Sequence, residues 1–527
     1  MKFQPQSLNG TTLAQRTLTL RKAFAGSIHL EALRAEVLRS RAEAFSKEKR
    51  HVLVSVLRKQ YGELGRHEGI AKQLDALEES HAVTMTCGHQ LILGGGPLYV
   101  HSKIREVLAL SIQWSTQKNK VVPIFWMATE DHDVEEIRHI VFEGKQYSMP
   151  NLFEGRATGS IPAAAALPMI KEMADDWSGH AGVLSMIDTL EKAYGGGGTL
   201  SDATRRLMAV WHPDVLCLDA ADPALKALAS PLWEEEVRSQ RLHRAQDPRP
   251  WKAKGWTAPV PTQESSLFHL KKGHRTRIDA EEEGFWRAGK ERWSTDALCQ
   301  HIAQHPEQIS PNALLRPLYQ EHILPNVLYA GGAGEMEYWL QLIPYLHETT
   351  LSPVRMHLRT SFEWWPEKSW RNWNKLASYQ LSYHASIEEV RNAWIQEEGS
   401  LPEGAPASTA LRKAVADIYG QQEGLQRSIE AWVKRTEREE DRMKERMRRA
   451  ILRKQQDRWR AFLAVKSTQF PGSVESGGVG SMQERTWTAL DLVFHFGRLP
   501  FEEMESGLTE HLDLHQDLGF NWVWMTP

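Results

Sequence analysis

Four side chains with acid–base and ligand chemistry stand together at Glu130, Asp131, His132 and Asp133. They directly follow an apolar stretch, residues 121–128, that predicts a buried strand. Carboxylates and an imidazole at such a position can bind an amine, hold a magnesium ion or transfer protons. We interpret all four as candidate catalytic residues. The alternative is a polar helix N-cap, because Asp is favoured there and acidic residues suit the first helical turn.

A second candidate segment, Cys87-Gly88-His89-Gln90, follows the apolar stretch 81–86 and precedes three glycines at 94–96. Glycine between a strand and a helix lets backbone N–H groups approach a phosphate or carboxylate closely. We therefore take Gly88, His89 and Gln90 as candidate binding residues, against the alternative of a tight turn with a capping histidine. Cys87 could be a nucleophile, but a small buried apolar side chain is the favoured interpretation.

A third glycine-rich turn follows the apolar stretch 326–330 and leads into a helix that starts with acidic character. Upstream of it, Arg316 could bind a carboxylate with two parallel hydrogen bonds, although a structural pair with Asp or Glu is equally compatible with the sequence. The candidate binding residues of this region are Asn312, Arg316, Gly331, Gly332, Gly334, Glu335 and Tyr338.

The elements that must position these residues are short apolar strands that alternate with helices. The strands are predicted at 81–86, 121–128, 215–219, 326–330 and 353–356, and helices at 99–118, 200–210, 222–243 and 335–347. This alternation is typical of an α/β fold with a parallel sheet covered on both faces. Because ligands bind at the carboxyl ends of such strands, His89, Asp131, Arg316 and Glu335 should line one pocket.

The chain is long enough, at 527 residues, for two or three domains. Apolar residues near heptad spacing, at Leu425, Ile429, Trp432, Met443, Met447 and Ile451, predict a coiled-coil arm that dimerises the protein, against the alternative of a solvated helix on its own core. The hairpin pattern around Gly273 predicts a small inserted subdomain. The expected segments are 1–80 (helical), 81–254 (core), 255–305 (insertion), 306–384 (core), 385–469 (arm) and 470–527 (a tail that packs back on the core).

Bulk properties exclude several classes of protein. The formal net charge of -3 gives no basic field for nucleic acid. The sequence has no apolar run of about 20 residues for a membrane span and no apolar signal at its N-terminus, so we expect a cytoplasmic protein. Three scattered cysteines make neither a disulfide framework nor a closed zinc site, and no resident metal site is predicted.

The three turns together resemble those of the bacillithiol-biosynthesis cysteine-adding family, the BshC cysteine ligases. The family's G-P-L-Y, P-V-F-W-x-A-x-E-D-H-D, S-P-N-x-x-L-R-P and Y-x-G-G-x-G-E-x-x-Y-W motifs are similar to residues 96–99, 123–133, 310–317 and 329–339, and its late F-P-G and Q-E-R to 470–472 and 483–485. The resemblance implies a Rossmann-like core related to class I synthetases, an inserted connective subdomain and a homodimer through the coiled coil. It also implies amide formation between the cysteine carboxyl and the amine of glucosaminyl malate.

The chain departs from the family pattern at Cys87, His89 and Ser266, where the family has Thr, Gln and usually Asn. Because a free acid does not form an amide in water without activation, we expect ATP or another adenine nucleotide, with magnesium as a possible companion ion. No K-M-S-K-S signature occurs, so the mode of activation stays open. The alternative functions are a non-catalytic scaffold on a degenerate synthetase-like core and a ligase for a different amine acceptor.

Overall fold

The computed structural model describes most of the chain, namely residues 2–7, 34–245, 260–261, 263–342, 345, 355–376, 386–397, 407–419, 426–454, 456–471, 483–502 and 520–525. The chain divides into two compact units. One unit comprises residues 2–363 and 484–524, and the other comprises 364–483 together with residues 1 and 525–527. The first heptad position, Leu425, lies outside the described residues.

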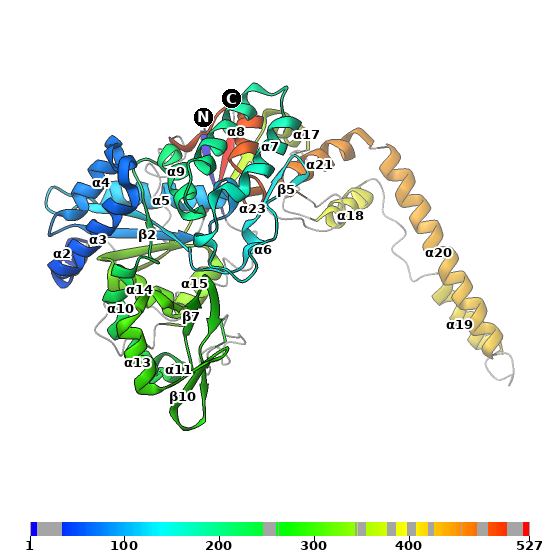
Figure 1. Ribbon diagram of the computed structural model, residues 1–527. Coiled ribbons are helices and arrows are strands. Elements are labelled where there is room, and N and C mark those ends of the chain that lie inside the picture. The colour runs from blue at the N-terminus through cyan, green and yellow to red at the C-terminus, as the bar shows by residue number, and fades with distance from the viewer. Residues whose placement is uncertain are drawn as a thin grey trace. The chain divides into compact units, whose positions relative to one another are not determined.

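A five-stranded parallel sheet forms the centre of the first unit (Figure 1). Its spatial order is β14-β13-β2-β3-β6, so β2, which comes first in the chain among these five strands, lies in the middle, with later strands added on either side. This is the order of a Rossmann-type sheet, and its switch point falls between β2 and β13. All five predicted core strands are confirmed: β2 (Val83–His89), β3 (Val121–Met127), β6 (Leu216–Asp219), β13 (Asn326–Gly331) and β14 (Arg355–Leu358).

The strands form where the sequence is almost wholly apolar, and every residue of β3 and β13 is buried. The helix α5 (Leu98–Trp114) contacts β2, β3 and β13 and is buried along most of its length, charged residues included. A capping box between Thr199 and Asp202 starts α9 (Leu200–Trp211). The remaining helices of this unit up to residue 245 are α2 (Arg34–Ala44), α3 (Lys47–Tyr61), α4 (Glu68–Glu78), α6 (Val134–Ile137), α7 (Leu167–Asp176), α8 (Ala181–Gly195), α10 (Pro223–Ser239) and α11 (Arg241–Ala245).

The predicted hairpin around Gly273 is confirmed: β7 (Leu267–Lys271) pairs antiparallel with β8 (His274–Arg277), and Gly273 turns at a φ of 83°. A third strand, β12 (Ile309–Pro311), pairs with β7. Further elements of this region are β9 (Asp279–Glu281), β10 (Phe285–Ala288), β11 (Glu291–Ser294), α13 (Thr295–Gln304), α14 (Leu315–Ile323) and α15 (Ala333–Leu340). The described strands that belong neither to the central sheet nor to this region are β1 (Lys2–Ser7), β4 (His139–Phe142), β5 (Lys145–Ser148), β15 (Ser361–Trp365) and β16 (Phe520–Met525).

The second unit is mainly helical, with α17 (Glu367–Leu376), α18 (Ile387–Glu397), α19 (Ala407–Tyr419), α20 (Gln426–Lys454) and α21 (Gln456–Gln469). The sequence predicts a helical hairpin formed by 385–400 and 410–462, whereas in the structure 410–462 is not one helix: α19 lies along α20, and α21 follows α20 (Figure 1). An aromatic cluster around Trp394 and Phe462 forms the core between α17, α18 and α21. The domain boundaries proposed from the sequence stay predictions.

The short helix α24 (Ala489–Phe496) and all but the first residue of α23 (Gln483–Thr486) belong to the first unit. The carbonyl of Trp487 accepts a hydrogen bond of 2.8 Å from the Leu98 N–H at the start of α5, and the Phe501 ring stacks on His101 of the same helix. Within the described residues, no helix combines the length and apolar composition that crossing a bilayer requires.

Candidate functional site

A cavity of about 580 Å³ opens at the carboxyl ends of β2 and β13, which is the switch point of the sheet. We call it the switch-point cavity. Because parallel neighbours end at the same edge, residues far apart in sequence meet there. Its lining comprises Gly88, His89, Gln90, Tyr99, Lys103, Trp126, Ala128, Asp131, Arg316, Tyr329, Gly332, Gly334, Glu335, Tyr338, Arg359 and Arg485. The four residues expected to share one pocket, His89, Asp131, Arg316 and Glu335, therefore do so.

Glu335 is held at the start of α15 by three groups. Its carboxylate accepts hydrogen bonds from the Gly332 N–H (2.8 Å) and the Tyr329 hydroxyl (2.7 Å), and it forms an ion pair with Lys103. Burial alone would raise the pKa of Glu335, but the Lys103 ammonium and these hydrogen bonds lower it to about 2. Glu335 is thus an ionised, fixed part of the wall.

His89 enters the same cavity from the end of β2. Its Nε2 lies 2.7 Å from the Tyr99 hydroxyl, and its Nδ1 lies 3.3 Å from the Gln90 carbonyl oxygen. Because a carbonyl only accepts, Nδ1 carries the proton and Nε2 accepts from Tyr99. Burial, together with the nearby Lys103, lowers the pKa of His89 to about 4, so the ring is neutral at pH 7.

The cationic side chains give this cavity its charge. Four of them, Lys103, Arg316, Arg359 and Arg485, face two carboxylates, Asp131 and Glu335. The Arg316 guanidinium donates to the Gln320 side chain at 3.1 Å and to the Tyr338 hydroxyl at 3.2 Å. Among the described residues no carboxylate forms an ion pair with Arg316, so the structural pair left open by the sequence is not found there. The cavity suits an anionic ligand.

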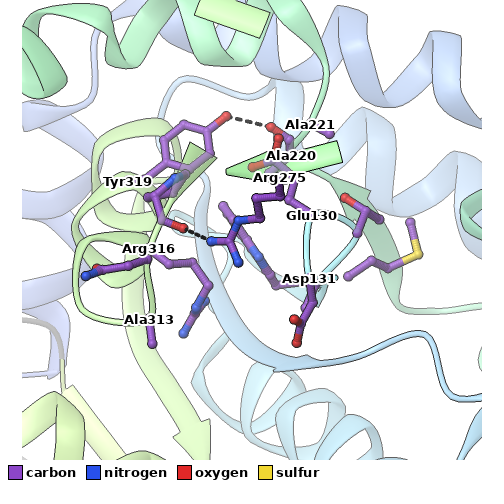
Figure 2. Close-up of a pocket in the computed structure, with 14 residues that line it drawn as sticks. Glu130, Asp131, Ala220, Ala221, Arg275, Ala313, Arg316 and Tyr319 are labelled. Carbon is purple, nitrogen blue, oxygen red and sulfur yellow. Dashed lines mark hydrogen bonds between the residues drawn. The ribbon is translucent and has the colours of Figure 1, made fainter. Parts of the chain in front are cut away.

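A second, smaller cavity of about 240 Å³ lies at the ends of β3 and β6, with walls that include Ala220, Ala221 and Ala313 (Figure 2). We call it the alanine-lined cavity. Trp126, Ala128, Asp131 and Arg316 line both cavities, so the two adjoin. The rest of its lining is Met127, Thr129, Glu130, Arg275, Pro311, Asn312 and Tyr319.

The two neighbouring acids, Glu130 and Asp131, are positioned by different partners. Glu130 forms an ion pair with Lys226, whose side chain is fully buried and also donates to the Ile309 carbonyl at 2.7 Å. Asp131 accepts hydrogen bonds from the His132 N–H and from the Gln90 side chain, both at 2.8 Å. Glu130 therefore lines the alanine-lined cavity but not the switch-point cavity, and Asp131 lies in the wall that both cavities share.

His132 and Asp133 line neither cavity. The Asp133 carboxylate accepts from the Glu136 N–H at 3.3 Å and is the N-cap of α6, which was the alternative interpretation of this acidic run. His132 is exposed, and its Nδ1 lies 3.3 Å from the Arg275 guanidinium. The two residues nevertheless stay close to the site, because the same turn carries Asp131.

Several glycines and one asparagine have structural roles. A Cβ on Gly331 would lie 2.9 Å from Met336 Cε and 3.0 Å from Tyr329 Cε1, so a larger residue would crowd these side chains, and Gly331 lines neither cavity. The Asn312 side chain borders the alanine-lined cavity but caps α14, accepting from the Leu314 and Leu315 N–H groups at 3.0 and 2.9 Å. Gly332 and Gly334 border the switch-point cavity at the start of α15.

Cys87 and the glycines 94–96 lie outside both linings. The thiol is fully buried, and burial raises its pKa, which fits a small apolar core side chain and not a nucleophile. The three glycines have φ between 71° and 86°, and a Cβ on Gly95 would meet the Trp211 ring. This turn therefore packs against the core, and ligand contact is left to Gly88, Gly332 and Gly334.

The sequence interpretation missed the cations that organise the site: Lys103, Lys226, Arg275 and Arg359. Lys103 and Lys226 lie inside helices whose neighbouring side chains are buried. A single lysine on a buried helix face needs a carboxylate or backbone carbonyls as partners. Its position in an otherwise apolar helix pattern could therefore have predicted a buried ion pair. Arg275 and Arg359 have no comparable local pattern.

The site fits the expected nucleotide in charge and in backbone groups. The Gly334 N–H, in the first turn of α15, borders the cavity beside the four cations, and helix N-termini bind phosphate in this way. Within the described residues, no group of three or more His, Cys, Asp or Glu side chains is arranged to hold a metal ion. Magnesium bound to phosphates needs only one or two protein carboxylates, and Asp131 is available in the shared wall.

Comparison with known proteins supplies the family. Residues 4–359 match the model of the N-terminal Rossmann-like domain of the bacillithiol biosynthesis protein BshC. Relatives named "Putative cysteine ligase BshC" include those of Cytophaga hutchinsonii (31% identical, over 83% of this chain and 82% of the relative), Flavobacterium johnsoniae (28%, over 84% of each) and Salinibacter ruber (26%, over 89% of each). With a Rossmann-like core whose switch point carries the matched turns, the chain belongs to the BshC family.

Proposed function

We propose that this protein is a ligase that joins cysteine to glucosaminyl malate by amide formation, as the last step of bacillithiol synthesis. The observation that carries the proposal is the pair of adjoining cavities at the switch point, with Asp131 and Arg316 in their common wall. Relatives across most of the chain bear the name of a cysteine ligase. An amide-forming enzyme must bring an acid and an amine together, and two cavities with a shared wall suit that task.

Each role follows from where the side chain lies. Arg316, beside Arg359, binds the carboxylates of the malyl group. Asp131, in the common wall, receives the proton of the attacking sugar amine, which must lose it to form the amide. Glu130 binds the ammonium group of cysteine. An adenine nucleotide, when bound, supplies the leaving group that makes the cysteine carboxyl reactive, and Lys103 with the Gly334 N–H group would hold its phosphates.

The His89 ring is where a change of acceptor would act. It replaces the Gln of the family pattern and borders the switch-point cavity, whereas Cys87, the other departure, is buried outside it. We further propose that the helical arm makes a homodimer, that residues 255–305 form the connective subdomain, and that the enzyme works in the cytoplasm, where free cysteine and nucleotides are found.

The decisive experiment incubates the pure protein with cysteine, glucosaminyl malate and ATP and looks for the amide by mass spectrometry. Arg316→Ala should raise the KM for glucosaminyl malate by about tenfold or more, since it removes a charge-assisted contact. Asp131→Asn should lower kcat by about a hundredfold, the usual scale for losing a positioned base. Absence of the amide under all nucleotide conditions would refute the function, and unchanged kinetics in both variants would refute these roles.

A further inference from the structure

Resting on the proposed ligase function, we propose that the alanine-lined cavity is the cysteine subsite and that Ala220, Ala221 and Tyr319 set the size of the amino-acid side chain it accepts. The acceptor sugar and the nucleotide phosphates then occupy the switch-point cavity.

The sizes of the cavities separate the two substrates. The alanine-lined cavity holds about 240 Å³, below the usual range of about 300–1,000 Å³ for drug-sized ligands, and the switch-point cavity holds about 580 Å³. A small amino acid fits the first. A sugar that carries a malyl group needs the second, whose cations also match its carboxylates.

The amino group of the ligand finds a fixed anion in the smaller cavity. The Glu130 side chain is 16% exposed, and its carboxylate is anchored by Lys226, a side chain with no solvent exposure. Lys226 is itself held by the carbonyls of Ile309 at 2.7 Å and Glu307 at 3.2 Å. A carboxylate fixed from behind in this manner keeps its remaining lone pairs directed at the cavity for an ammonium donor.

The far wall is apolar and rigid, as a thiol-bearing side chain requires. The Tyr319 hydroxyl donates to the Ala220 carbonyl at 2.7 Å (Figure 2), and the Tyr319 ring meets Trp126 edge to face. The Ala221 N–H is bound to the Asp219 carboxylate at 3.0 Å, which fixes the backbone of this wall. A methyl group at each of the two positions leaves room for a short side chain and excludes a longer one.

The cysteine carboxyl then points to the common wall. Asp131 and Arg316 border both cavities, so a carboxyl carbon in the smaller one and an amine in the larger one meet beside these two residues. The amine nitrogen bonds to that carbon, the activating group leaves with the carboxyl oxygen, and the amine proton passes to Asp131. Arg275 also borders the smaller cavity, where it donates to the Pro311 carbonyl at 2.6 Å.

The test fills the cavity with Ala221→Leu in the full-length protein. We expect the KM for cysteine to rise about tenfold or more, with the KM values for glucosaminyl malate and ATP unchanged. The matched control is Ala224→Leu, an exposed position on α10 three residues away that lines neither cavity. Calorimetric titration with cysteine alone gives a readout independent of turnover, and thermal unfolding shows whether both variants fold.

The outcomes separate this inference from the proposed function. Amide formation with unaltered cysteine binding in Ala221→Leu would overturn the subsite and leave the ligase intact. A rise in the KM for glucosaminyl malate instead would assign the cavity to the acceptor. The wild-type protein could instead bind cysteine but form no amide. If Ala221→Leu then abolishes cysteine binding, the subsite is supported and the ligase proposal fails. If Ala221→Leu does not fold, Glu130→Gln replaces it, and the subsite requires the same selective weakening of cysteine binding.

Discussion

At the scale of single residues, the charge of Glu335 depends on one cation. Lys103 is almost fully buried, with 3% of its side chain exposed, and forms an ion pair with Glu335. Lys103→Met would leave that carboxylate without its cation in a poorly hydrated wall. We expect the free energy of unfolding at pH 7 to fall by about 3–5 kcal/mol, the usual cost of breaking a buried pair. Urea denaturation measures it.

The pH dependence of the same variant carries a sign that can be checked. The pKa of Glu335 is lowered to about 2 in the folded protein from an ordinary value of 4.5, so its contribution is complete above pH 4.5 and lost as the pH falls toward 2. In Lys103→Met, this fall in the stabilising contribution of Glu335 between pH 4.5 and pH 2 should be absent. The double variant Lys103→Met/Glu335→Gln should recover part of the stability, and a double variant no more stable than the single one would contradict the pairing.

His89 gives a second prediction, with titration in a different range. Its pKa is lowered from 6.5 to about 4 by burial and by Lys103, so the folded protein excludes a proton that the unfolded chain accepts. Stability from this group is therefore present above pH 6.5 and lost as the pH falls to 4. Relative to wild type, His89→Gln should gain stability over that interval, by about 1–3 kcal/mol at pH 4.

Denaturation at several pH values measures the effect, with His51→Gln, at an exposed position on α3, as the control. An unchanged difference between His89→Gln and wild type from pH 7 to pH 4 would mean that the folded protein binds the His89 proton as readily as the unfolded chain. In that case burial would not lower the pKa of His89.

At the scale of elements, the turn after β3 separates capping from chemistry. Asp133 is the N-cap of α6 and borders neither cavity, although its sequence position made it a catalytic candidate. Asp133→Ala should cost about 1 kcal/mol of stability, and Asp133→Ser, which keeps a capping oxygen, much less. Both should leave the rate of amide formation within about twofold, because neither changes the cavity walls. A large loss of kcat in a stable Asp133→Ser variant would restore the catalytic role.

Strands of the central sheet were predictable because burial on both faces demands continuous apolar runs, as in β3. The hairpin of β4 and β5 was missed, since Lys145–Ser148 is mostly polar and carries no such run. Likewise β9 and β11 are polar and half exposed. In the arm, charged residues occur at every turn of 407–454, so the sequence pattern did not predict the division into α19 and α20. Propensity identifies helix there but does not indicate where the chain reverses.

At the scale of the whole chain, the sequence predicts which turns meet at one edge of the sheet but not which side chains pair there. Parallel strands end at one edge whatever their loops contain, and so His89, Asp131, Arg316 and Glu335 could be assigned to one pocket from their positions after strands. The assignment of Lys226 to Glu130, 96 residues away by the numbering (226 − 130), depends on how α10 packs, which no local pattern records. The division into two cavities depends on the same packing.

The proposed homodimer is the last property at this scale, and α20 offers a surface to test it. Trp432, Met443 and Met447 are 42%, 57% and 41% exposed, and their spacing puts them on one face of the helix. Apolar side chains at such spacing are typical of a coiled-coil seam. We expect the full-length chain, of 60.1 kDa, to elute with about twice that mass in light scattering, and Met443→Glu/Met447→Glu to reduce it to the monomer. Lys434→Glu, on the opposite face, should leave the dimer intact because it adds a charge away from the seam. A monomeric wild type at micromolar concentration, or a dimer that survives both methionine substitutions, would assign this helix face to another role.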